Sequence, residues 1–187
     1  NGIHNFVVLA NGDLLIADSF NHAIRKIEAK SGIATTIAGD GKKGFRGDGG
    51  PAAAAQFDTP IQIALDPAGK RLFVADIGNK RVRRIDLATS IITTVAGNGR
   101  GGVPADGALA LETSLVDPRA VAVAADGSFY ILERGGHALR HVDAGGRIRT
   151  VAGTGKPGPS GDGGPALAAM MNGPKYITLD RDDNVLI

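Results

Sequence analysis

Short apolar segments separated by turn sequences run along the whole chain, and they come in groups of four. In the middle of the chain the segments lie near residues 61–66, 71–76, 81–87 and 91–96. Residues such as Gly, Pro, Asn and Asp stand between them, which is the pattern of strands joined by hairpin turns. We therefore expect four short strands here, each antiparallel to the next, in one sheet.

The group of four strands recurs along the chain. An Ala-Gly pair that closes the fourth strand begins at Ala38, Ala96 and Ala152, so the spacings are 58 and 56 residues. The longer phrases that recur are Leu15–Glu28, Phe73–Asp86 and Tyr130–Asp143, and then Ile33–Gly41, Ile91–Gly99 and Ile148–Gly155. A fixed period of this size indicates an array of supersecondary units. Four antiparallel strands per unit are typical of a β-propeller blade. The sequence predicts an all-β fold, a β-propeller of four-stranded antiparallel blades, with about three blades in this chain.

The repeats make one domain, residues 1–187, out of consecutive units. The expected units are residues 1–58, 59–116 and 117–172, followed by the start of another at 173–187. Residues 1–16 match residues 172–187 at an offset of 171. Because propellers usually close with 4–8 blades, we expect either a fragment of a longer, six-bladed protein or half of a ring that two copies complete.

Each unit is longer than four strands require, and the surplus follows the fourth strand. It begins with a Gly-rich loop, GDGG at residues 47–50 and 161–164, and continues into an Ala-rich stretch. We expect a loop with one or two helical turns here. Pro51 and Pro165 suit the first helical position, and Asp48 and Asp162 just upstream suit the N-cap.

These phrases resemble those of the NHL repeat family. The resemblance covers essentially the whole chain and rests on ADSFNHAIRKI at residues 17–27, ADIGNKRVRRI at 75–85, TTVAGNG at 93–99 and SGDGGPALAAMMNGPKYITLD at 160–180. It implies a propeller, commonly of six blades. The third copy departs from the family pattern at Glu133 and at Gly135-Gly136, and the second copy lacks GDGG.

An acidic residue stands seven positions before an arginine in every copy. The pairs are Asp18 with Arg25, Asp76 with Arg83 and Glu133 with Arg140. The spacing crosses one hairpin turn, so the two side chains can meet on paired strands. We interpret them as structural charge pairs repeated once per blade. The alternative is a ring of polar residues around a functional site.

Other chemistry in the sequence is sparse. The chain has no Cys, which excludes disulfides and thiolate metal sites. GDGG lacks the Lys-Ser/Thr ending of a phosphate-binding loop, and Asp180–Asn184 lacks the glycine and distal glutamate of a calcium loop. His22 and His137 recur at equivalent positions beside a turn, where we expect hydrogen-bonded or exposed residues away from the propeller axis. We therefore expect no catalytic residue, no cofactor site and no metal ligand in this chain.

The function expected from these features is a non-catalytic binding or protein-interaction scaffold that is part of a larger protein. One alternative is a propeller enzyme, a lyase or hydrolase, with its active site in the central channel or outside this segment. Another is an RNA-binding NHL domain, although the net charge of +2 and the thin basic stripe of Lys26, Arg84 and His141 make nucleic acid an unfavoured partner. The expected partner is a protein, a small molecule or a carbohydrate. No segment is apolar enough for a membrane span, and the resemblance favours an extracytoplasmic location.

Overall fold

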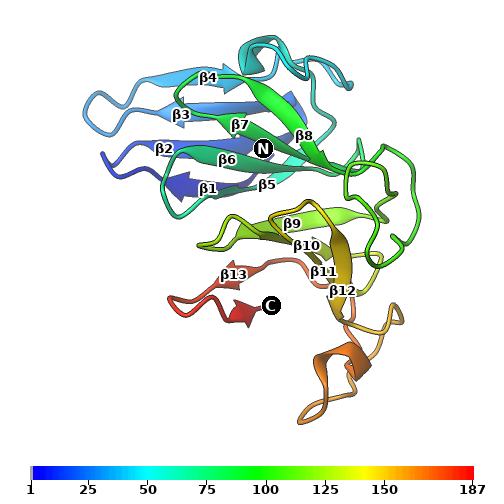
Figure 1. The fold of residues 1–187 in the computed structure, drawn as a ribbon. Coiled ribbons are helices and arrows are strands. Elements are labelled where there is room, and N and C mark those ends of the chain that lie inside the picture. Colours follow the sequence, from blue (N-terminus) through cyan, green and yellow to red (C-terminus); the bar gives the residue numbers. More distant parts are fainter. Residues whose placement is uncertain (1) are drawn as a thin grey trace.

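The computed structural model describes residues 2–187, which form three four-stranded sheets and one two-stranded sheet, all antiparallel. Figure 1 shows the sheets following one another in chain order, from blue to red. The first sheet contains β1 (Ile3–Val8), β2 (Leu14–Asp18), β3 (Ala23–Ile27) and β4 (Ala34–Ala38). The second contains β5 (Pro60–Leu65), β6 (Arg71–Asp76), β7 (Arg81–Asp86) and β8 (Ile92–Ala96). The third contains β9 (Pro118–Val123), β10 (Phe129–Glu133), β11 (Ala138–Val142) and β12 (Ile148–Ala152). The last pairs β13 (Thr178–Leu179) with β14 (Val185–Leu186).

The strands expected from the sequence are confirmed in position and pairing. The second sheet follows the order β5-β6-β7-β8, as four consecutive hairpin-linked strands must. Its first turn shows why: the Asp66 carboxylate accepts the backbone N–H groups of Lys70 and Arg71, and Gly69 takes a positive φ of 65°. Asp and Gly at these positions close the hairpin tightly. The three complete sheets are the blades of an open propeller, and they do not close into a ring.

Apolar side chains from neighbouring sheets fill the space between them. One buried cluster joins the first and second sheets through residues such as Leu15 and Val74, and another joins the second and third through Phe73 and Ile131. Neighbouring sheets thus bury their facing sides against each other, as successive propeller blades do.

Two amide side chains also join the innermost strands. Asn5 Oδ1 accepts the backbone N–H of Ile63 at 3.0 Å, and Gln62 Oε1 accepts that of Val121 at 2.9 Å. Each amide therefore ties one inner strand to the next. Ala120 stands at the matching place in β9 and cannot make this bond.

The connecting segments correct one expectation. The Ala-rich stretches form single 3₁₀ turns, η2 (Ala52–Ala54) and η3 (Ala166–Ala168), and the third such turn is η1 (Ser19–Asn21). Pro51 is the N-cap of η2 rather than its first residue, and no side chain caps this turn. Asp48 is therefore not a capping residue. Its carboxylate reaches the next sheet instead.

The connecting segment also pairs with that sheet through its backbone. Gly49 N–H donates to the carbonyl of Ile92 at 2.8 Å, and Ile92 N–H donates to the carbonyl of Gly50 at 3.1 Å. Between the second and third sheets the same exchange joins Gly107 and Ala108 to Ile148. The first two connecting segments thus extend the next blade at its outer strand.

Candidate functional site

Arg83 lies at the centre of the most elaborate polar cluster in the described chain. Its side chain is fully buried, and its Nε and Nη2 atoms donate to Asp48 Oδ1 at 3.0 and 2.7 Å. Its remaining donors reach the carbonyls of Gln56 and Arg46 at 2.9 and 3.2 Å. Asp48 Oδ2 accepts from the hydroxyl of Thr94 at 2.6 Å. One carboxylate on the connecting segment therefore holds two strands of the next blade.

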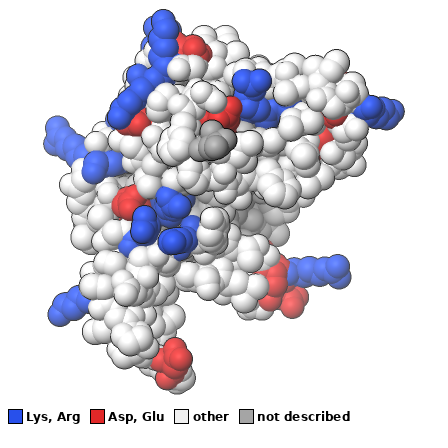
Figure 2. Space-filling model, turned by 180° about the vertical axis from the view of Figure 1, so that it is seen from behind, with Lys and Arg blue, Asp and Glu red and all other residues white. Residues whose placement is uncertain are grey.

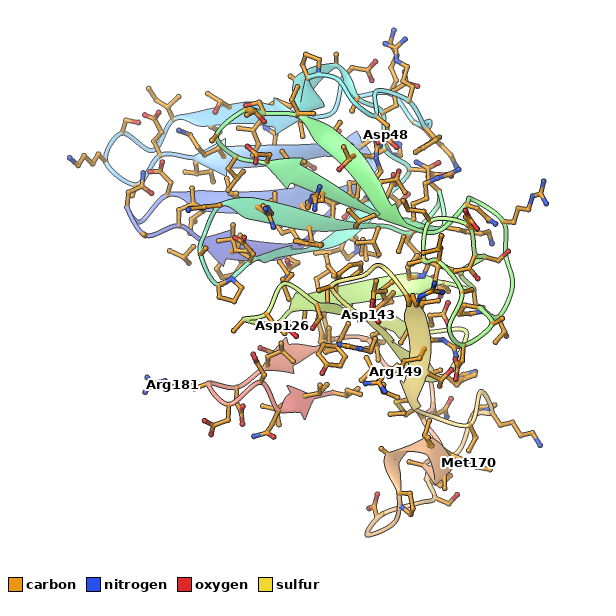
Figure 3. The ribbon with its side chains drawn as sticks, viewed as in Figure 1. Asp48, Asp126, Asp143, Arg149, Met170 and Arg181 are labelled. Atoms are coloured by element: carbon orange, nitrogen blue, oxygen red, sulfur yellow. The ribbon has the colours of Figure 1, made fainter. Side chains whose placement is uncertain are left out.

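The sequence did not identify Asp48 as the partner of Arg83. The sequence pairs Arg83 with Asp76, but their closest atoms, Nη1 and Oδ2, lie 3.8 Å apart. Asp48, labelled in Figure 3, binds Thr94 of the outer strand β8, which lies 46 residues later in the chain. The available signal is the recurrence of an aspartate in every connecting segment, at Asp48, Asp106 and Asp162.

Asp76 occupies a different environment from Asp48. It is fully buried, and that burial raises the pKa of its carboxyl to about 7. Hydrogen bonds from Asn79 Nδ2 and from the backbone N–H of Asp58, both at 2.8 Å, and the charge of Arg83 oppose the rise in pKa. Asp76 therefore fastens the turn after β6 to the connecting segment before β5.

The third sheet keeps the charge pair in its expected form. Arg140 Nε donates to Glu133 Oε2 at 2.8 Å, and both side chains are buried. Glu133 Oε1 also accepts the backbone N–H of Val116 at 2.7 Å. Asp106 accepts the backbone N–H and the hydroxyl of Thr150, which repeats the contact of Asp48 with Thr94.

The first sheet does not form the expected pair. Within residues 2–187, Asp18 accepts from Asn21 Nδ2 at 2.9 Å and makes no ion pair with Arg25. The Nε atom of Arg25 is buried and has no hydrogen-bond partner among the described residues. Spacing alone therefore brings acid and arginine near each other but does not decide which carboxylate the arginine binds.

The recurring histidines are hydrogen-bonded residues, as expected. His22 and His137 both have positive φ, 51° and 46°, at the turn before the third strand of their sheets. Their Nδ1 atoms accept backbone N–H groups of Thr59 and Gly173, at 3.1 and 3.2 Å. Each histidine anchors the connection into the next sheet. Across residues 2–187 no three His, Asp or Glu side chains gather in a way that could hold a metal ion.

An axial cavity of about 420 Å³ lies where the innermost strands meet. Its lining is apolar apart from the uncharged groups of Asn5, Gln62, Tyr176 and Thr178. No Asp, Glu, Lys, Arg or His is among the described residues that line it. The cavity therefore offers a ligand apolar surface and a few hydrogen bonds, and Tyr176 is the one titratable side chain among the described residues that line it.

The basic stripe considered in the sequence is interrupted. Lys26 Nζ lies 3.5 Å from Asp13 and 3.4 Å from Glu28, and the ring of His141 packs 4.9 Å from that of Tyr130. Burial and the charge of Arg149 lower the pKa of His141, which favours its uncharged form. Figure 2 shows one face of the molecule, on which basic side chains alternate with acidic ones. Among the described residues, no helix has the length and hydropathy needed to cross a membrane.

Several curated proteins are similar to this chain over part of its length. It is 42% identical over 82 residues to Protein SUPPRESSOR OF QUENCHING 1, chloroplastic, from Arabidopsis thaliana, covering 43% of the chain and 8% of that protein. It is 31% identical over 80 residues to NHL repeat-containing protein 2 from Bos taurus, covering 43% of the chain and 11% of that protein. It is 31% identical over 157 residues to Teneurin-4 from Mus musculus, covering 78% of the chain and 5% of that protein. The chain thus spans about a tenth or less of these relatives.

Solved structures share its fold. An auxiliary nutrient binding protein from Bacteroides thetaiotaomicron VPI-5482 matches with a TM-score of 0.70 at 19% identity, covering 95% of this chain and 43% of that one. A chain of the nidogen/laminin complex matches with a TM-score of 0.63 at 16% identity, covering 96% and 53%. Virginiamycin B lyase from Staphylococcus aureus matches with a TM-score of 0.56 at 17% identity, covering 96% and 46%.

No family model matches the chain. The relatives, the repeated phrases and the propeller sheets nevertheless agree with one another, and each of the three complete sheets carries one copy of the recurring phrases. On these grounds the chain belongs to the NHL repeat family.

Proposed function

We propose that this propeller segment acts as a binding scaffold, non-catalytic in itself, within a larger protein. The observation that carries the proposal is the uncharged lining of the axial cavity. The buried ionisable residues lie elsewhere and are engaged in intramolecular contacts: Asp76, Arg83, Glu133 and Arg140. These charges are committed to joining strands and connecting segments, which leaves apolar surface and amide or hydroxyl groups for a ligand.

The proposed ligand is a protein, a small molecule or a carbohydrate. Propellers of similar fold include a nutrient binding protein and a chain of the nidogen/laminin complex, which supports binding as the function. We extend the proposal to an extracytoplasmic location on the same grounds, and to repeat units at residues 1–58, 59–116 and 117–172, with another starting at 173. Fractionation of cells that express the natural protein tests the location.

The binding proposal is tested by blocking the cavity. Thr178 lines it and is exposed, so Thr178→Trp places a large side chain at its mouth. Thr35→Trp on the exposed outer strand β4 is the matched control. The three proteins are compared by biolayer interferometry against an oligosaccharide array and against laminin. We expect at least one of these ligands to bind the wild type. Its affinity for the Thr178→Trp variant should be at least about tenfold weaker than for the wild type, and its affinity for the control should be unchanged.

The enzyme alternative has its own readout. Virginiamycin B lyase shares the fold, so virginiamycin B is the substrate to test. Incubation with this chain, followed by chromatography, should leave the compound unchanged. Turnover that disappears in the Thr178→Trp variant would replace the scaffold proposal with a catalytic one.

A further inference from the structure

A groove of about 430 Å³ lies between the second and third sheets and shares no lining residue with the axial cavity. Among the residues that line it, Phe73 in β6 and Phe129 in β10 are buried, and their ring centroids lie 5.2 Å apart. Leu109 and Leu111 of the connecting segment also line it, and they are 41% and 54% exposed. The groove has the size of a small-molecule site, since such sites usually measure roughly 300–1,000 Å³.

The matching groove between the first and second sheets is smaller, at about 170 Å³. Three of its lining residues precede lining residues of the larger groove by 58 positions: Leu15, Lys26 and Ile37 precede Phe73, Arg84 and Val95. Leu87, directly after the last residue of β7, lines the smaller groove and packs against the apolar cluster between the sheets. Ala144 takes the equivalent place after β11. The smaller side chain leaves the groove between the second and third sheets open.

Two arginines stand on the wall that the second sheet contributes. Arg71 and Arg84 lie on one face of this sheet, because Arg84 is paired with Phe73, two residues after Arg71. Long side chains in such a diagonal arrangement can reach each other. In the first sheet the same diagonal carries Asp13 and Lys26, which form an ion pair at 3.5 Å. The second sheet therefore has two like charges where the first has an ion pair.

The arginine pair has no direct counter-ion on the protein. Within residues 2–187 neither Arg71 nor Arg84 forms an ion pair. Asp86 is paired with Arg71 across the strands, but its carboxylate accepts from the hydroxyl of Thr89 at 3.0 Å and from two backbone N–H groups of the same turn. The two guanidinium groups are therefore left to an incoming anion.

The other side of the groove carries two acidic residues, Glu112 of the connecting segment and Asp143 of the third sheet. Asp143, labelled in Figure 3, accepts the backbone N–H of Arg147 at 2.9 Å and so closes the hairpin between β11 and β12. Glu112 is exposed, and water and salt screen an exposed charge. The second-sheet wall is thus the basic side of the groove.

We propose that this groove between two blades binds a small aliphatic or aromatic carboxylate. The carboxylate accepts from Arg71 and Arg84, since charge-assisted hydrogen bonds to guanidinium groups are among the strongest in proteins. The hydrocarbon part of the ligand packs against Phe73, Phe129 and Leu111. The site lies apart from the axial cavity, so it adds a second ligand to the scaffold and does not name the ligand of the cavity.

Octanoate is the probe, because it joins one carboxylate to a short apolar chain. Isothermal titration calorimetry with the whole chain should show one octanoate bound per chain. Octylammonium and 1-octanol carry the same apolar chain with a positive charge or none, and each should bind at least about tenfold more weakly. Octylammonium binding as tight as that of octanoate would overturn the role of the arginines and favour Glu112 and Asp143 instead.

Two variants test the two walls of the groove separately. Arg71→Asp gives Arg84 an acidic neighbour, as on the same diagonal of the first sheet. Ala144→Leu introduces the side chain that stands at this place in the smaller groove. Each variant should bind octanoate at least about tenfold more weakly than the wild type. Lys30→Asp makes the same charge change on an exposed turn outside the groove and should leave the affinity unchanged.

The other results also decide whether the site exists. Circular dichroism establishes that the variants are folded. A wild type that does not bind octanoate, or an unchanged affinity in either folded groove variant, would overturn the proposal. Thr178→Trp, which blocks the axial cavity, should bind octanoate as tightly as the wild type does. Loss of binding in this variant would place octanoate in the axial cavity and overturn the groove as its site.

Discussion

The contact between Asp48 and Arg83 leads to a stability prediction with an internal control. Asp48→Ala removes three hydrogen bonds, two from Arg83 and one from Thr94. Arg83 remains fully buried, and it keeps the carbonyls of Gln56 and Arg46 as partners. In the variant the buried Arg83 guanidinium therefore keeps some of its hydrogen bonds but loses the carboxylate that neutralises its charge most closely.

The size of the effect follows from burial. Removing one member of a fully buried ion pair costs about 3–5 kcal/mol. The Asp48 side chain is 35% exposed, so water can replace part of what it supplies, and we discount the loss to about 2–3 kcal/mol. For a protein of this size that corresponds to a melting temperature lower by roughly 5–10 °C.

Asp162→Ala is the matched control. It changes the same residue in the same GDGGPA sequence, but at a position that contacts no described side chain. We expect at most about 0.5 kcal/mol, as for other exposed positions. Urea unfolding followed by circular dichroism gives both values. Equal destabilisation by the two variants would refute a specific role for Asp48 and would show that it contributes no more to stability than Asp162 does.

Three further predictions concern contacts elsewhere in the fold. Burial raises the pKa of Asp76 from 3.8 to about 7, so the native state holds the carboxyl proton more tightly than the unfolded chain. The protonated carboxyl therefore stabilises the native state below pH 4, and this stabilisation is lost as the pH rises to 7. The stability of Asp76→Asn relative to the wild type should therefore increase over that range, by about 4 kcal/mol at most, and a constant difference in pH-dependent urea titrations would contradict the raised pKa. Gln62→Ala leaves the buried N–H of Val121 unpaired, so the free energy of unfolding should fall by about 1–3 kcal/mol. Hydrogen exchange at the Val121 amide should become faster, and unchanged exchange would show that the bond is not formed in solution. Gly97→Ala should destabilise more than Gly127→Ala. Both glycines have positive φ, but only at Gly97 would the new Cβ clash with a backbone oxygen, that of Lys80. Equal melting temperatures of the two variants would argue against this close approach.

Local patterns predicted most of the fold. The strands of the second sheet appear where the apolar segments and turns placed them, because alternation and turn residues act within one hairpin. The caps expected from Pro51 and Asp48 are absent because the neighbouring sheet holds the connecting segment instead, where Ala52 N–H donates to the carbonyl of Ser90. That partner lies 38 positions away and leaves no local trace in the sequence.

The polar contacts were harder to predict for the same reason. The seven-residue spacing brought Glu133 and Arg140 together, since both lie on one hairpin. The partner of Arg83, Asp48, comes from the connecting segment before the second sheet, 35 residues earlier in the chain. Gln62 lies in an otherwise apolar inner strand, and its bond to the next blade depends on the packing of the sheets, which no local pattern records.

A double-mutant cycle between Asp48 and Arg83 tests most directly whether the connecting segments clamp one blade to the next. The cycle compares the unfolding free energies of the wild type, Asp48→Ala, Arg83→Met and the double variant. Residues in direct contact show coupling energies of 0.5–3 kcal/mol, and for this buried, two-bonded contact we predict about 2 kcal/mol or more. A coupling energy within about 0.3 kcal/mol of zero, with all four proteins folded, would contradict the clamp.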